Sequence, residues 1–121
     1  MEKFGLKAEK WIISILKSNG FSVIKSSDIE DLIFKVDFWI QHDNYWIPVQ
    51  FSVDKEAIIS WKGTNSLRLG IVPMWIDGNK LRRAFEDEDG IELIKEFWNR
   101  VEQIIENCSI KRFQTPNWSC A

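Results

Sequence analysis

With 121 residues, of which 45% are hydrophobic, the chain is long enough for one domain with a single core. A formal charge of −2 excludes a protein that coats nucleic acid through a basic surface. Because His42 is the only histidine, Cys/His zinc sites and most Ser–His or Cys–His catalysis are excluded as well.

Two further features bear on where the protein works. The cysteines, Cys108 and Cys120, are too few for a disulfide framework. No apolar run approaches the roughly 20 residues that span a membrane, and the charged, amphipathic start does not resemble a signal peptide. We therefore expect a cytoplasmic protein that makes no contact with a membrane.

The first predicted element is a helix over residues 3–18, where apolar side chains recur with a period of 3.6 residues. These are Phe4, Ala8, Trp11, Ile12, Ile15 and Leu16. Asn19 and Gly20 end the helix, because both tolerate the left-handed conformation found after a helix C-terminus. A short strand over 21–25 and a polar loop over 26–31 follow.

Two alternating segments then predict a β-hairpin. Residues 33–41 and 45–53 each place apolar side chains on one face and polar or mixed side chains on the other. A two-residue turn at Asp43 and Asn44 matches the two apolar faces and so sets the register. The predicted pairs are His42 with Tyr45, Phe38 with Val49, Asp37 with Gln50, Val36 with Phe51 and Lys35 with Ser52.

The second half of the chain completes an α-β-β-β-α-β-α order. Its predicted elements are a partly helical segment over 55–69 interrupted at Gly63, a strand over 71–76, a short helix over 80–85 and a helix over 91–105. We assign residues 1–108 to the folded domain and expect residues 109–121 to form a loosely held C-terminal tail.

Seven tryptophans are many for so short a chain. Several lie within apolar runs, which favours packing in and near the core. Stacking on exposed nucleic-acid bases is the alternative.

Glu9 is an exception to the separation of apolar and polar side chains on the two sides of the first helix. On a helical wheel it falls between Leu16 and Ile13, inside the apolar arc. A carboxylate buried there is costly unless it is paired or bound to a metal ion. The alternative is that Glu9 lies at the rim of the arc and reaches water.

Asp37 and Gln50 face each other in the predicted register, at a distance that lets two side-chain oxygens share one cation. Mg²⁺ prefers hard oxygen ligands and keeps several waters, so two or three protein oxygens are enough. Trp39 and Trp46 share this face, which suggests that it is partly covered. The alternative is an ordinary solvated sheet face.

These features together resemble the PD-(D/E)XK nuclease superfamily, above all its small Holliday-junction-resolvase-like members. The resemblance spans about residues 3–76. It is carried by Gly5-Leu6-Lys7-Ala8-Glu9, Val36-Asp37-Phe38 and Val49-Gln50-Phe51-Ser52. It implies an α/β fold with a restriction-endonuclease-like αβββαβ core, a central mixed four-stranded sheet flanked by helices.

The resemblance also implies an activity, the Mg²⁺-dependent hydrolysis of DNA phosphodiester bonds. Glu9, Asp37 and Gln50 would hold Mg²⁺ (or Mn²⁺), which activates water and stabilises charge on the phosphate oxygens. Ser52 stands where the superfamily has a lysine, and the substitutes in this chain are Lys35, Lys55 and Lys62. The expected phosphate contacts are Lys35, Lys55, Lys62 and Arg68.

Two other functions stay open at this point. With Gln50 in place of glutamate and Ser52 in place of lysine, the protein could have lost nuclease activity and serve as a nucleic-acid-binding or assembly subunit. The polar residues could also be incidental to a plain α/β interaction protein. Because so short a nuclease has little room for a recognition domain, we expect a homodimer or a larger protein partner.

Overall fold

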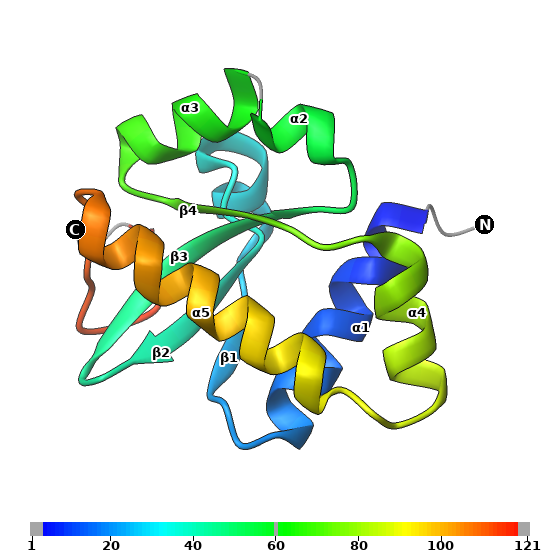
Figure 1. Cartoon of the computed structure of the whole chain (residues 1–121). Coiled ribbons are helices and arrows are strands. Elements are labelled where there is room, and N and C mark those ends of the chain that lie inside the picture. The colour runs from blue at the N-terminus through cyan, green and yellow to red at the C-terminus, as the bar shows by residue number, and fades with distance from the viewer. Residues whose placement is uncertain (1–3, 60, 119–121) are drawn as a thin grey trace.

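The protein is an α/β structure built on an open four-stranded sheet flanked by helices (Figure 1). The computed structural model describes residues 4–59 and 61–118, and for Trp61 and Lys62 it describes the backbone only. In chain order the elements are α1 (Phe4–Ser18), β1 (Val23–Lys25), the π-helix η1 (Glu30–Phe34), β2 (Phe38–His42), β3 (Tyr45–Ser52), α2 (Lys55–Ile59), α3 (Trp61–Leu69), β4 (Val72–Trp75), α4 (Gly78–Glu86) and α5 (Ile91–Asn107).

The sheet is mixed, with strand order β1-β2-β3-β4. Strands β1, β2 and β3 are antiparallel neighbours, and β4 runs parallel to β3 after the crossover through α2 and α3. The predicted hairpin register is confirmed from His42↔Tyr45 to Phe38↔Val49. The predicted pairs Asp37–Gln50, Val36–Phe51 and Lys35–Ser52 are not formed, because β2 begins only at Phe38. The turn is tight, and Asp43 adopts the positive φ of 55° that such a hairpin needs.

The first half of the predicted strand over 33–41 is wrong. Residues 30–34 form the π-helix η1, which ends at Lys35 with a φ of 60°, and β2 begins only at Phe38. The cause is a reciprocal cap: Ser27 Oγ accepts from the Glu30 N–H (3.2 Å), and Glu30 Oε1 accepts from the Ser27 N–H (2.9 Å). This cap starts a helical turn where alternation alone indicated a strand.

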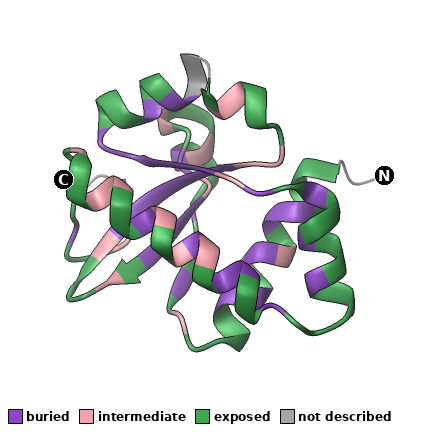
Figure 2. Cartoon of the chain, viewed as in Figure 1, coloured by how far each residue is buried: buried purple, intermediate pink, exposed green. Residues whose placement is uncertain are grey.

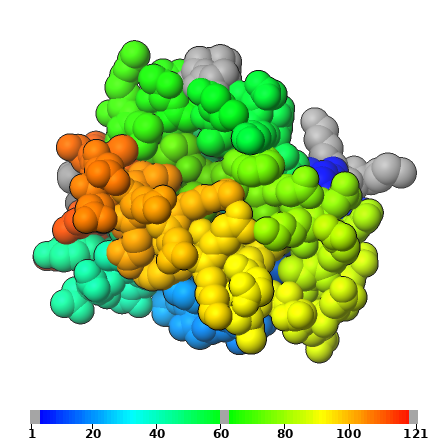
Figure 3. All heavy atoms as spheres, viewed as in Figure 1, coloured from blue at the N-terminus to red at the C-terminus, as the bar shows by residue number. Residues whose placement is uncertain are grey.

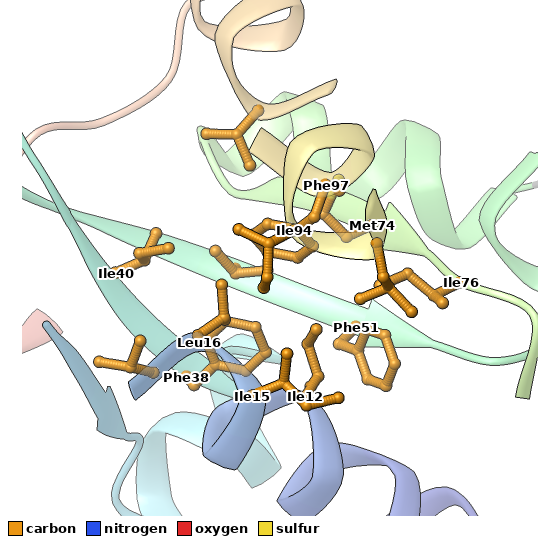
Figure 4. Close-up of a cluster of buried hydrophobic side chains, with 14 of the residues drawn as sticks. Ile12, Ile15, Leu16, Phe38, Ile40, Phe51, Met74, Ile76, Ile94 and Phe97 are labelled. Carbon is orange, nitrogen blue, oxygen red and sulfur yellow. The ribbon is translucent and has the colours of Figure 1, made fainter. Parts of the chain in front are cut away.

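One face of the sheet packs on α1, α4 and α5. Apolar side chains of these helices meet those of all four strands in one cluster, and Figure 4 shows ten of its labelled members between the helices and the sheet. Phe38 and Phe97 stack within it, with ring centroids 6.5 Å apart. This cluster fixes α1 against the sheet and so fixes the position of Glu9.

The other face is covered by η1, by α2 and α3, and by the C-terminal segment. Its smaller cluster consists of Val36, Trp39, Ile71 and Phe113, with Phe34, Trp46 and Trp118 packed against it. In Figure 2 the strands between the two layers are mostly purple, because both of their faces are covered.

The segment that we expected to be loosely held makes specific contacts up to Trp118. Phe113 pairs with Trp46 through two backbone hydrogen bonds of 2.7 and 2.9 Å and is only 4% exposed. The Trp118 ring stacks on Phe34, and the backbone N–H of Trp118 donates to Glu30 Oε2 (2.7 Å). Residues 119–121 lie outside the described part of the chain.

Helices α2 and α3 follow β3, and the predicted interruption at Gly63 is wrong, because Gly63 lies within α3; residue 60, between the two helices, is outside the described part of the chain. Gly63 allows the two helices to approach closely. A Cβ atom there would collide with the carbonyl oxygen of Ile58. This position therefore needs glycine for space, not for a left-handed backbone.

We expect Gly63→Ala to lower the free energy of unfolding by about 1–3 kcal/mol, because the backbone of α2 must move to admit a methyl group. Gly5→Ala on α1 is the matched control. A Cβ at Gly5 meets no described atom within 4 Å, so alanine there should be neutral or stabilising by up to about 1 kcal/mol. Urea denaturation of both variants checks this, and equal effects would contradict the close approach.

Candidate functional site

Glu9 is buried on α1, with only 7% of its surface exposed. It does not reach water at the rim of the helix, which was the alternative considered above. Lys25 at the end of β1 donates to its carboxylate, with Nζ 3.3 Å from Oε1. Burial raises the pKa of Glu9; the positive charge of Lys25 opposes this, and the negative charge of Asp31 adds to it.

Asp37 sits at the irregular start of β2, where its side chain replaces part of the β-ladder. Its N–H donates to the Val49 carbonyl (2.8 Å), and its Oδ2 accepts from the N–H of Phe51 (2.7 Å). The backbone of Ser26 holds it from the other side, because the Ser26 N–H and Oγ both donate to the Asp37 carbonyl. The backbone of Asp37 is thus held from both sides, and its carboxylate is held by the Phe51 N–H on β3.

The pKa of Asp37 is raised to about 7. Burial is the main cause; the hydrogen bond from the Phe51 N–H opposes it, and the charges of Glu9 and Asp31 raise the pKa further. Two acids from distant parts of the sequence, Glu9 and Asp37, therefore lie close enough to repel each other. This juxtaposition is the central part of the predicted site.

Asp31 is a member of this carboxylate cluster that sequence reasoning missed. It belongs to η1, and its side chain lies close enough to raise the pKa of Asp37. The Ser27-to-Glu30 capping box was the available signal, because it predicts a helical turn that carries the next residue toward the sheet. Lys25, which pairs with Glu9, was also missed, because it reaches the cluster only through the β1–β2 pairing that sets it opposite Phe38.

Gln50 is buried on β3 but is engaged elsewhere. Its amide oxygen, the atom expected to join the cation, accepts a short hydrogen bond from the hydroxyl of Ser66 on α3. Ser52 also has a local role: its Oγ accepts from the Asp54 N–H (2.9 Å) in the turn that leads into α2. Gln50 and Ser52, the two β3 positions of the predicted motif, thus hold α3 and the turn into α2 in place.

The basic residues predicted for the site are dispersed. The Lys55 ammonium lies 5.2 Å from the centroid of the Trp75 ring, at the β4 edge of the sheet. Lys35 is exposed at the end of η1, and Arg68 is exposed in the last turn of α3. Lys62 lies on α3, but its side chain is outside the described part of the structure. Among the described side chains, it is Lys25 that pairs with a carboxylate of the cluster, that of Glu9.

Whether the site fits a metal ion depends on its donors. Within residues 4–59 and 61–118, no three His, Cys, Asp or Glu side chains are already arranged as a ligand set. The chemistry of the cluster nevertheless suits a hard divalent cation, because the buried Glu9 and the half-buried Asp37 are oxygen donors whose mutual repulsion a cation would relieve. Two carboxylates with water ligands match how Mg²⁺ is usually held.

The fold and the site together define an α/β protein with a partly buried carboxylate cluster at the start of the second strand. Comparisons with protein-family models, with curated proteins and with solved structures found no match to this chain. Among the described helices, none is long and apolar enough to cross a membrane.

Proposed function

We propose that the protein is a restriction-endonuclease-like member of the PD-(D/E)XK class and hydrolyses DNA phosphodiester bonds with the help of one Mg²⁺ or Mn²⁺. The observation that carries the proposal is the meeting of Glu9 from α1 with Asp37 from the start of β2, beside the backbone of Phe51 on β3. The αβββαβ order of the elements is consistent with that class.

In this proposal Glu9 and Asp37 hold the cation, which supplies activation of water and stabilisation of charge on the phosphate oxygens. The Phe51 N–H keeps one oxygen of Asp37 in place. Asp31 adds negative charge beside Asp37, which a bound cation would offset. Gln50 positions α3 through Ser66 and is not assigned a ligand role.

Lys25 takes the role of the superfamily's lysine, whose position is occupied here by the uncharged Ser52. Its side chain is 55% exposed, so the ammonium is accessible to a phosphate group while it stays beside Glu9. A lysine at this point offsets phosphate charge and stabilises the negative charge that develops in the transition state. Lys35, Lys62 and Arg68 stay predictions as further phosphate contacts.

A second candidate is a nuclease fold that binds DNA or assembles with a partner but no longer cuts. The hydrogen bond between Ser66 and Gln50 favours it, because it engages the oxygen that the superfamily offers to the metal. The use of Ser52 in a turn favours it too.

Cleavage of supercoiled plasmid and of a branched DNA junction in Mg²⁺ tests the proposal. We expect Asp37→Asn to abolish cleavage and Lys25→Met to lower its rate by about 10²-fold. Lys17→Met, which changes an exposed lysine near the end of α1, is the matched control and should keep the wild-type rate.

Fluorescence anisotropy of the same labelled junction separates the two candidates. Binding without cleavage in the wild type would replace the first candidate with the second. Neither binding nor cleavage would contradict both.

A further inference from the structure

The C-terminal segment is fastened to the body of the protein at three points. The Lys111 N–H donates to the Gly70 carbonyl (2.9 Å) just after α3, and Phe113 pairs with Trp46 on β3. In Figure 3 the orange end of α5 and the residues that follow it lie between the green of α3 and the cyan of the β2–β3 hairpin. The third point is Trp118, which contacts η1.

Residues 26–37, which include η1, form a closed loop beside the carboxylate cluster. The two ends of the loop meet because the N–H and Oγ of Ser26 donate to the Asp37 carbonyl (3.2 and 2.9 Å). Compact loops whose ends meet in this way are often functional. Lys25, which pairs with Glu9, directly precedes the loop, and Asp37 ends it. The loop therefore joins two parts of the proposed cation site.

Glu30 connects the interior of this loop to the rest of the protein. Its carbonyl accepts from the Val36 N–H (3.1 Å) and its carboxylate accepts from the Ser27 N–H, so one residue ties both sides of η1. The same carboxylate accepts from the Trp39 indole on β2 and from the backbone N–H of Trp118. Glu30 is 7% exposed, so these hydrogen bonds are shielded from water.

The loop has few buried apolar side chains that would seat it independently. Three of its large aliphatic side chains are 63–73% exposed, namely Ile29, Leu32 and Ile33. Its apolar contacts with the body come from Val36 and from Phe34, whose ring stacks on that of Trp118 with centroids 5.0 Å apart. The seating of η1 therefore depends on Trp118 as well as on Glu30.

Asp31 directly follows Glu30, so the seating of η1 brings a negative charge to the cluster. After burial, this charge is one of the causes that raise the pKa of Glu9 and of Asp37. Without a cation, repulsion among the three carboxyl groups therefore opposes the seated loop. A cation at Glu9 and Asp37 offsets this repulsion, and the charge of Asp31 adds to the attraction for the cation.

We propose that the C-terminal segment is a positioning element for the cation site: the seating of Trp118 on η1 and the binding of a cation at Glu9 and Asp37 strengthen each other. Trp118 and Glu30 are positioning residues that act through Asp31. Because such coupling is reciprocal, seating strengthens cation binding by the same factor by which the cation strengthens seating. The inference rests on the cation site of the proposed function.

Calorimetric titration with Mg²⁺ tests one direction of this coupling. We expect Trp118→Ala to weaken Mg²⁺ binding by about fivefold or more, because loss of the ring loosens η1. Trp118→Phe keeps an aromatic ring for Phe34 and should restore most of the affinity. Trp98→Ala is the matched control: it removes a half-buried tryptophan from its contact with Phe21 on the opposite face of the sheet and should leave the affinity unchanged.

Amide hydrogen exchange of the wild-type protein tests the other direction and needs no substitution. Saturating Mg²⁺ should slow exchange of the Trp118 N–H by about fivefold or more in the wild type and leave it unchanged in Glu9→Gln. The Ile94 N–H, which donates to the Gly90 carbonyl at the start of α5, should slow by a smaller factor.

Two results would overturn the inference and leave the cation site standing: Mg²⁺ binds Trp118→Ala as tightly as the wild type, or Mg²⁺ leaves exchange at Trp118 unchanged. Equal weakening by Trp98→Ala would also overturn it, because the effect would then follow general stability. If the wild type binds no Mg²⁺, the cation site itself is contradicted, and this inference with it.

Discussion

Replacing Asp37 with asparagine should stabilise the protein at pH 8 by about 2–4 kcal/mol. The pKa of Asp37 is about 7 in the folded protein, whereas an unfolded aspartate has a pKa near 3.8. The folded state therefore favours the protonated carboxyl group. The free energy of unfolding of the wild type therefore falls as the pH rises from about 4 to about 7, because Asp37 becomes ionised in the folded state, and it stays lowered above that range.

Asp37→Asn removes the destabilisation caused by ionising Asp37 and keeps an oxygen that can accept a hydrogen bond from the Phe51 N–H. The variant and the wild type should therefore differ little at pH 4 and most at pH 8. Urea denaturation at both pH values checks this. Glu106→Gln, at an exposed position on α5, is the control and should show no such difference. A destabilised Asp37→Asn variant at pH 8 would contradict the repulsion inferred for the cluster.

The second large effect concerns Glu30, a buried acid whose pKa is lowered, whereas that of Asp37 is raised. Burial raises its pKa, but hydrogen bonds from the N–H groups of Ser27 and Trp118 and from the Trp39 indole outweigh burial and lower the pKa overall. The charged form of Glu30 thus ties together η1, β2 and the C-terminal segment.

We expect Glu30→Ala to lower the free energy of unfolding by about 2–5 kcal/mol at pH 7, because it leaves the buried Trp39 indole and two backbone N–H groups without their acceptor. The stabilisation by Glu30 is present above the ordinary glutamate range and is lost as the pH falls through its lowered pKa. The difference from wild type should therefore shrink on acidification, opposite in sign to that of Asp37. A loss no larger than that of Glu106→Gln would show that these hydrogen bonds contribute little.

The hairpin and the position of Glu9 followed from the sequence because both depend on local periodicity. Matching two alternating segments across a two-residue turn fixes one register, and the pairing of Phe38 with Val49 is the result. The helical wheel placed Glu9 among apolar residues, and the carboxylate is buried. Asp37, by contrast, was predicted opposite Gln50 but lies just before β2, where its carboxylate accepts from the Phe51 N–H.

Other features depend on interactions that periodicity does not contain. The cap between Ser27 and Glu30 competes with strand alternation and wins because Glu30 also gains donors from Trp39 and Trp118. Trp118 is 88 residues from Glu30 in the sequence, so the sequence around Glu30 does not predict this hydrogen bond. The same π-helix brings in Asp31, which is why a third carboxylate was not anticipated.

Gln50 shows the limit of pattern matching at a site. Its place on β3 agrees with the register, but the pattern does not tell which neighbour its amide oxygen meets. The fold supplies Ser66 from α3, a partner set by the crossover connection. The lysine of the pattern was likewise sought near Ser52, whereas the cation beside Glu9 comes from β1.

Calorimetric titration of the wild-type protein with Mg²⁺ or Mn²⁺ at pH 7.5 tests most directly whether the meeting of Glu9 and Asp37 forms a cation site. We expect one site, with affinity at least tenfold weaker in both Glu9→Gln and Asp37→Asn and unchanged in Glu106→Gln. Heats of dilution only in the wild type, or equal binding by all four proteins, would contradict a cation site at these carboxylates.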